Sequence, residues 1–162
     1  MNLFIMRHGD AALQAASDAM RPLTELGILE AKVMAKWLNI ENLKIDAILV
    51  SPYVRAQQTS QAVIDTLKPE LSCNLAVQTL DLLTPEGSAS TVHDYLDGLI
   101  EPAGYENVLI ISHMPIVSYL CAELTIHSQS PIFATAAIAK IDYSTDLMTG
   151  QLVKMVSPDN FC

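Results

Sequence analysis

The sequence predicts a single α/β domain, and three observations support this fold class. Short apolar runs, typical of buried strands, alternate along the chain with longer segments whose apolar residues recur at helical spacing. No internal repeat, low-complexity segment or linker rich in Pro, Gly and Ser divides the 162 residues. A chain of this length buries one ordinary hydrophobic core. We therefore expect residues 1–162 to fold as one unit.

The first elements are a buried strand and a helix. Residues 3–6 form an uninterrupted apolar run and predict a strand. Residues 23–38 have helical periodicity, with Thr24 as the expected N-cap and Glu30 on the exposed face.

A second strand and a second helix follow. Residues 46–50 predict the strand, and residues 53–67 predict the helix. Ser51 is the expected N-cap of this helix, and Pro52 occupies the first helical position, where proline is tolerated. Residues 75–79 predict a weaker strand.

The second half of the chain continues the alternation. The expected helices are 88–100 and 115–124, and the expected strands are 107–111, 136–141 and 151–156. The last two strands are separated by a turn with a glycine, as expected of a hairpin.

The composition excludes several classes of protein. A net charge of −9 makes nucleic acid and anionic membranes unsuitable partners. The cysteines Cys73, Cys121 and Cys162 are odd in number and contain no CxxC pair, which argues against a disulfide framework and a zinc site. No apolar stretch is long enough to span a membrane, and the N-terminal segment lacks a secretory signal, so we expect a cytoplasmic protein.

The arginines point to a phosphate site. The chain has only three, Arg7, Arg21 and Arg55, and all lie near its beginning, whereas the lysines are scattered. Arginine presents a rigid fork of donors that suits phosphate oxygens, while lysine acts as a hydrated point charge. This distribution predicts an anion site built from the first third of the sequence.

Candidate site residues come directly after three predicted strands. Arg7, His8 and Gly9 follow the first strand, residues 51–55 follow the second, and His113 follows the fourth. The carboxyl ends of parallel strands share one edge of a sheet, where ligands bind and helix N-termini favour anions. We therefore expect two histidines and two arginines to meet there.

Simpler interpretations exist for each residue alone. A histidine after a strand can bond a nearby backbone group, Gly9 can be a turn residue, and Arg55 can be a surface charge. Their combination at one edge favours the functional interpretation. His93 and His127 have no motif around them and are expected on a helix surface and in a loop.

Four motifs, in order, resemble those of the histidine phosphatase superfamily. They are RHG at 7–9, PLTxxG at 22–27, SPxxRAxxT at 51–59 and SHMP at 112–115. The RHGDA start, the RPLT segment, LTPEG at 83–87 and the short length are most similar to the SixA-type phosphohistidine phosphatases. The resemblance implies a three-layer α/β/α sandwich with a mostly parallel central sheet, of the phosphoglycerate mutase-like kind, without a lid insertion.

The resemblance also implies roles for the site residues. His8 would be the nucleophile, which accepts the phosphoryl group and surrenders it to water. The side chains around the phosphoryl oxygens would be Arg7, Arg55 and His113, with Gly9 and Arg21 completing the phosphate-binding set. The arginines are expected to keep His8 neutral by like-charge repulsion. No metal or other cofactor is expected, since fixed cations stabilise the charge.

One departure from the family concerns the general acid. Many relatives have a glutamate where this chain has Leu82, so the nearby Asp81 and Glu86 are the candidate acids. A phosphorus–nitrogen bond to imidazole is more labile than an ester bond, so expelling imidazole demands less of an acid. The departure favours phosphohistidine over sugar phosphates.

The other departure is the short stretch between Arg55 and His113. Relatives that act on small metabolites carry an insertion here that walls the site. An open, shallow site suits a phosphorylated side chain on another protein. We expect a monomer that acts on a histidine-containing phosphotransfer domain of a bacterial signalling relay or on a phosphotransferase-system protein. The alternatives are a phosphatase of small phosphate esters and a non-catalytic phosphate-binding module.

Overall fold

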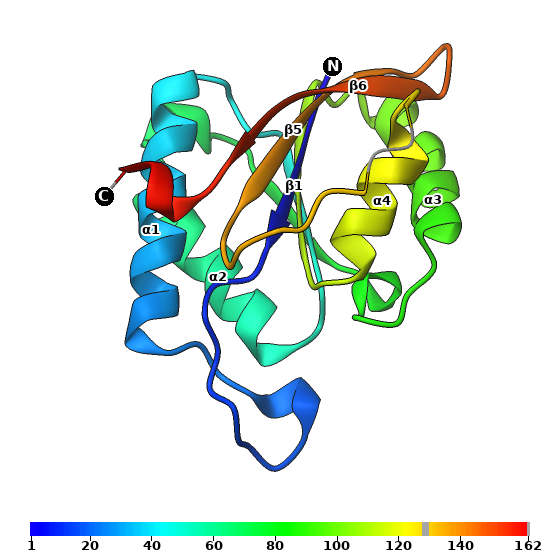
Figure 1. Ribbon diagram of the computed structural model, residues 1–162. Coiled ribbons are helices and arrows are strands. Elements are labelled where there is room, and N and C mark those ends of the chain that lie inside the picture. Colours follow the sequence, from blue (N-terminus) through cyan, green and yellow to red (C-terminus); the bar gives the residue numbers. More distant parts are fainter. Residues whose placement is uncertain (128–129, 162) are drawn as a thin grey trace.

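The computed structural model describes residues 1–127 and 130–161 (Figure 1). Six strands form one sheet in the order β3-β2-β4-β1-β5-β6. The strands are β1 Asn2–Arg7, β2 Ala47–Val50, β3 Ala76–Thr79, β4 Asn107–Ser112, β5 Ile138–Ser144 and β6 Thr149–Val156. The helices are α1 Glu25–Glu41, α2 Val54–Thr66, α3 Ala89–Ala103 and α4 Ile116–Leu124.

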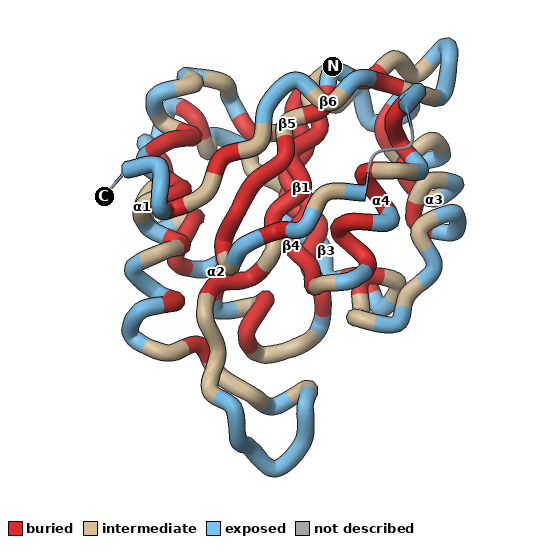
Figure 2. The backbone as a smooth tube through the Cα atoms, in the orientation of Figure 1, coloured by how far each residue is buried: buried red, intermediate tan, exposed pale blue. Residues whose placement is uncertain are grey.

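Helices cover both faces of the sheet, α1 and α2 on one face and α3 and α4 on the other (Figure 1). Successive side chains of β1 point to opposite faces. Leu3 and Ile5 therefore join the core under α3 and α4, and Phe4 and Met6 join the core under α1 and α2. The middle strands are buried on both sides, as Figure 2 shows. The predicted three-layer α/β/α sandwich is confirmed.

The sheet is mostly parallel, which determines where the strand ends lie. β1, β2, β3 and β4 pair in parallel, and β5 and β6 form an antiparallel hairpin beside β1. Arg7 lies opposite Ser112, and Val50 lies opposite Ile111. The residues that follow β1, β2 and β4 are therefore neighbours at one edge.

The start of α1 was predicted correctly. Thr24 is its N-cap, and the Thr24 hydroxyl accepts a hydrogen bond from the Gly27 N–H at 3.1 Å. This bond satisfies one of the donors that the first turn of a helix leaves free.

The predicted start of α2 was wrong, because the N-cap is Tyr53 and not Ser51. The Ser51 N–H still donates to the Ile111 carbonyl in the sheet, at 3.1 Å. Pro52 and Tyr53 connect the end of β2 to α2. Pro52 therefore lies before the helix and not in its first position. The Ser51 hydroxyl is thereby left at the sheet edge.

A long loop between β1 and α1 was not assigned a structure from the sequence. It projects beyond the carboxyl edge of the sheet (Figure 1) and contains a short 3-10 helix, Asp18–Met20. Three more 3-10 helices lie at Pro69–Leu71, Asp81–Leu83 and Pro158–Phe161. Within residues 1–127 and 130–161, no helix has the length and apolar character needed to cross a membrane.

Candidate active site

The two histidines of the predicted site face each other at the carboxyl edge of the sheet. His8 follows β1 and His113 follows β4, and their ring centroids are 5.1 Å apart. The two residues are only 6% and 1% exposed, respectively. Arg55, in the first turn of α2, is 4% exposed and donates from Nε to His8 Nε2 at 3.2 Å. The structure thus brings together residues that the sequence separates by about a hundred positions.

Hydrogen bonding assigns the proton on the His8 ring. His8 Nδ1 lies 2.7 Å from the Gly9 carbonyl oxygen. A carbonyl oxygen can only accept, so Nδ1 carries the proton of the neutral ring. Nε2 then holds a lone pair, to which Arg55 donates. Nε2 is therefore the atom that can attack an electrophile.

Both histidines are held neutral. The pKa of His8 is lowered to about 4, mainly by burial; the Gly9 carbonyl opposes this, and the positive charges of Arg55, Arg7 and Arg21 add to it. The pKa of His113 is lowered to about 3, again mainly by burial, and repulsion from Arg55, and from His8 when that ring is protonated, adds to it. The sequence had suggested the arginines as the cause, but burial has the larger effect.

These pKa values predict how the rings respond to pH. We expect the ring proton shifts of His8 and His113 in NMR spectra to stay constant from pH 8 to about 5, because both folded pKa values lie well below the ordinary histidine pKa of 6.5. A titration of either ring with a midpoint near 6.5 would contradict the prediction.

The same shifts contribute to stability. The unfolded chain binds protons at these histidines more readily than the folded chain does. Their stabilising contribution is therefore present above pH 6.5 and is lost as the pH falls toward 4 for His8 and 3 for His113. For His8, the contribution is the difference in the free energy of unfolding between the native protein and a His8→Asn variant, measured by urea unfolding at several pH values.

Ser51 and Tyr53 position His113. His113 Nε2 lies 2.6 Å from the Ser51 hydroxyl oxygen, and the Tyr53 ring packs edge-on with centroids 5.0 Å apart. Among the described residues, His113 Nδ1 has no hydrogen-bond partner although it is buried. A buried polar atom without a partner is unusual, and here it can serve a ligand oxygen. The sequence motif contained Ser51, but its function as a partner of His113 was not predicted.

Asp18 links two of the arginines. Arg55 donates from Nη1 to the Asp18 carbonyl oxygen at 2.6 Å and from Nη2 to Asp18 Oδ2 at 3.1 Å. Arg21 donates from Nη1 to Asp18 Oδ1 at 2.9 Å and from Nε to the Ala12 carbonyl oxygen at 2.6 Å. Arg21 and Arg55 together hold the pKa of Asp18 below its usual range. No motif signals Asp18, so sequence reasoning missed it.

The Arg7 side chain is held by a backbone carbonyl group in the segment before β5. Its Nη1 donates to the Phe133 carbonyl oxygen at 2.8 Å. Burial lowers the pKa of Arg7, and the charge of Glu30 opposes this effect. Glu30 was predicted on an exposed face, but it is half-buried and accepts hydrogen bonds from the Asp10 N–H and the Thr135 hydroxyl, each at 2.8 Å. That prediction was wrong because Asp10, at the start of the long loop, and Thr135, before β5, lie against this turn of α1.

Gly9 has a packing role that the sequence did not predict. Its N–H donates to the Thr59 hydroxyl at 3.1 Å, and its carbonyl oxygen lies against His8 Nδ1. A Cβ at Gly9 would lie 2.4 Å from the Gly27 carbonyl oxygen. Both backbone polar groups are occupied and the space beside Cα is filled by α1, so this geometry does not support the predicted phosphate contact.

A Gly9→Ala substitution tests this packing. We expect it to lower the free energy of unfolding by about 1–3 kcal/mol, because backbone cannot move aside as a side chain can. Gly98→Ala is the matched control, since nothing lies within 4 Å of a Cβ there. In a helix that change is expected to stabilise by about 0.5–1 kcal/mol. Equal stability of the two variants in urea unfolding would refute the packing role.

The candidate general acids are exposed residues that follow β3. Asp81 begins the 3-10 helix after β3, Glu86 lies in the following turn, and both side chains are exposed. In the part of the chain that is described, neither makes a hydrogen bond or ion pair with His8, His113 or an arginine. Their role as acids stays a prediction.

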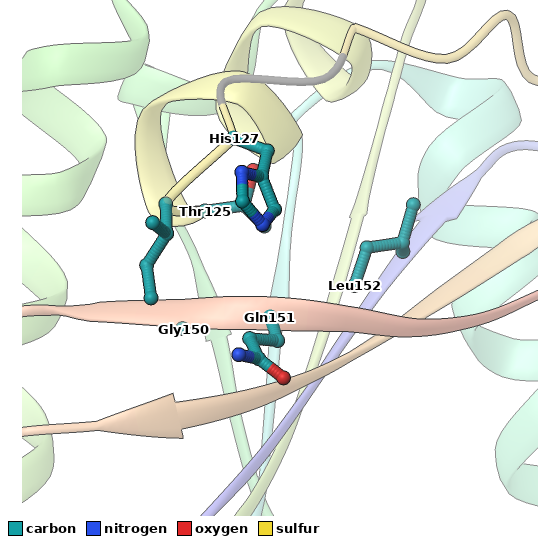
Figure 3. Close-up of a pocket in the computed structure, with 6 residues that line it drawn as sticks. Thr125, His127, Gly150, Gln151 and Leu152 are labelled. Atoms are coloured by element: carbon teal, nitrogen blue, oxygen red, sulfur yellow. The ribbon is translucent and has the colours of Figure 1, made fainter.

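The remaining histidines lie outside this site. His93 was predicted on a helix surface, but its ring is largely buried and contacts the Tyr143 hydroxyl at 2.8 Å and Glu123 at 3.2 Å. His127 is exposed and lines a cavity of about 160 Å³ between the end of α4 and β6. Figure 3 shows this cavity, with His127 and Thr125 beside β6. None of the predicted phosphate-binding residues lines it.

This chain is similar in sequence to known proteins. The model of the histidine phosphatase superfamily (branch 1) matches residues 3–91. The phosphohistidine phosphatase SixA of Escherichia coli is 47% identical over 141 residues, which cover 87% of this chain and 84% of that protein. A SixA homologue of Haemophilus influenzae is 42% identical over 147 residues, covering 87% of each chain.

A solved structure gives the same result for the fold. It is the protein histidine phosphatase SixA complexed with tungstate, which superposes with a TM-score of 0.91 at 43% identity, over 100% of both chains. This match confirms the fold that the motifs implied. With the fold, the order of the motifs and these relatives in agreement, the chain belongs to the histidine phosphatase superfamily.

Proposed function

We propose that this protein is a phosphohistidine phosphatase that removes the phosphoryl group from a histidine-containing phosphotransfer protein in the cytoplasm. The observation that carries the proposal is the state of His8, whose Nε2 is unprotonated and lies 3.2 Å from the Arg55 guanidinium, beside a second neutral imidazole. The names of the relatives support the substrate class, since they are phosphohistidine phosphatases.

In the first step, His8 Nε2 attacks the phosphorus atom of the substrate. The bond from Nε2 to phosphorus forms as the bond from phosphorus to the substrate imidazole breaks, and the leaving nitrogen takes a proton from solvent. The hydrogen bond from Arg55 Nε to His8 Nε2 must break, because the same lone pair makes the new bond. The freed Nε–H then has a phosphoryl oxygen within reach.

In the second step, the bond from a water oxygen to phosphorus forms as the bond from phosphorus to Nε2 breaks, orthophosphate leaves, and the water gives up a proton to solvent. The Nε2 lone pair is restored, and Nδ1 keeps its proton on the Gly9 carbonyl throughout. Arg7, Arg21, Arg55 and the unpaired His113 Nδ1 stabilise the charge on the phosphoryl oxygens in both steps. The arginines supply the positive charge and the neutral His113 a hydrogen bond, so we expect a chelator to leave turnover unchanged.

The tungstate complex of the relative supports an oxyanion site of this kind. Tungstate is a tetrahedral oxyanion of the same shape as phosphate, and that relative is 43% identical over the full chain. In this chain Asp18, which contacts Arg55, and Arg21 line an open groove of the projecting loop. An open site accepts a phosphohistidine displayed on a protein surface.

The substrate is tested by a comparison of turnover. The purified protein is incubated with radiolabelled phosphotransfer domains, with a phosphotransferase-system protein and with aryl and sugar phosphates. We expect kcat/KM to be far higher for a phosphohistidine protein. A higher kcat/KM for the small esters would discard the substrate class, and no turnover of any of them would discard the enzyme and favour a binding module.

A further inference from the structure

Asp18 occupies the donors that the proposed function assigns to the phosphoryl group. The Asp18 carbonyl oxygen and Oδ2 accept hydrogen bonds from Nη1 and Nη2 of Arg55, and Asp18 Oδ1 accepts one from Nη1 of Arg21. A carboxylate and a phosphoryl group are both anionic acceptors that fit a guanidinium fork. They therefore compete for the same side chains.

Of these partners, Asp18 is the one that is free to move. Its side chain is 56% exposed, whereas that of Arg55 is 4% exposed. Arg55 is also held through its own backbone, because the Thr59 hydroxyl donates to the Arg55 carbonyl oxygen at 2.7 Å. Asp18 lies on the projecting loop, beside an open groove lined by Leu13, Ser17 and Arg21. An incoming anion can displace the carboxylate without disturbing the core.

We propose that Asp18 is a specificity-determining residue, an internal carboxylate that external anions must displace from Arg55 and Arg21. This inference rests on the proposed function. It makes the site bind free orthophosphate and small phosphate esters weakly. A phosphorylated protein offsets the cost with contacts that a small ester lacks, including contacts with the loop that carries Asp18, where Leu13 is 89% exposed and Met20 is 55% exposed.

The charge of Asp18 sets the size of the effect. A carboxylate a few ångströms from a bound dianion repels it, and at a solvent-exposed position this repulsion corresponds to roughly a tenfold change in affinity. Removing the charge should therefore strengthen anion binding. A residue that only oriented the arginines would have the opposite effect, because its loss would leave the arginines misplaced.

The test is the affinity of an Asp18→Asn variant for orthophosphate and for tungstate, measured by titration calorimetry. We expect the dissociation constants to fall on the order of tenfold. Asp146→Asn is the matched control, since it removes the same charge from an exposed position in the β5–β6 turn. The control should bind both anions as the native protein does. We also expect kcat/KM for an aryl phosphate to rise relative to that for a phosphohistidine protein.

Unchanged or weaker anion binding by a folded Asp18→Asn variant would overturn the inference. Its melting temperature is compared with that of Asp146→Asn, and Asp18→Ser provides a second variant if Asp18→Asn does not fold. Anion binding is measured without turnover, so this failure is separate from that of the proposed function. The latter is decided by the native protein with its phosphohistidine substrates.

Discussion

Replacing His8 with alanine is expected to lower phosphohistidine turnover on the order of 10⁴- to 10⁶-fold, the loss typical of removing a covalent nucleophile. The neighbouring neutral imidazole, His113, should not replace it, because its Nε2 already contacts the Ser51 hydroxyl and Arg55 Nε donates to His8. The measurement is the release of label from a phosphorylated phosphotransfer domain. The native protein should also carry a transient phosphoryl group that the variant lacks.

The fold should survive this substitution, since the backbone around His8 is held by its own hydrogen bonds. The His8 N–H donates to the Ser112 carbonyl, and its carbonyl accepts from the Ala136 N–H. His127→Ala is the control, because His127 is exposed and lies outside the site. A folded His8→Ala variant with native activity would refute the mechanism.

Replacing Arg55 is expected to have the next largest effect. Arg55→Ala should lower kcat/KM on the order of 10³-fold, because one preorganised donor to a developing charge contributes about 10²–10³ in rate and Arg55 offers more than one. Arg55→Lys should not restore activity. A lysine cannot reach His8 Nε2 and both acceptors of Asp18 at once, since it has no planar fork.

The folded fraction distinguishes catalysis from folding in these variants. Loss of transition-state stabilisation and a smaller folded fraction both lower the apparent kcat and can leave KM unchanged, but calorimetric melting reports the folded fraction. The comparison is therefore made per folded molecule. Native kcat in a folded Arg55→Lys variant would show that charge alone suffices, which contradicts the role of the fork.

The sequence could predict the strands and their shared edge because both depend on local pattern. The apolar run before Arg7 and the one before Ser112 each read as a buried strand, and parallel pairing then places His8 beside His113. The N-cap Thr24 was predictable for the same reason, since capping is a matter of nearest neighbours. These features follow from residues close together in the chain.

Other parts of the site depend on contacts that no local pattern encodes. Asp18 meets Arg55 only because the projecting loop folds back over α2. Ser51 was predicted to cap a helix, but its N–H donates to the Ile111 carbonyl in the sheet and its hydroxyl contacts His113. The large pKa shifts of the two rings likewise arise mainly from burial, which the charged residues of the sequence motifs do not reveal.

The two histidines directly follow the paired strands β1 and β4. Their ring separation of 5.1 Å is close to the spacing of about 4.8 Å between neighbouring strands. Their relative placement is therefore a property of main-chain pairing, largely indifferent to which side chains pack beneath α1 or α3. Inherited changes in those helices should alter how many molecules are folded in the cell more than how fast each one works. The outer layers are free to diverge while the chemistry stays fixed.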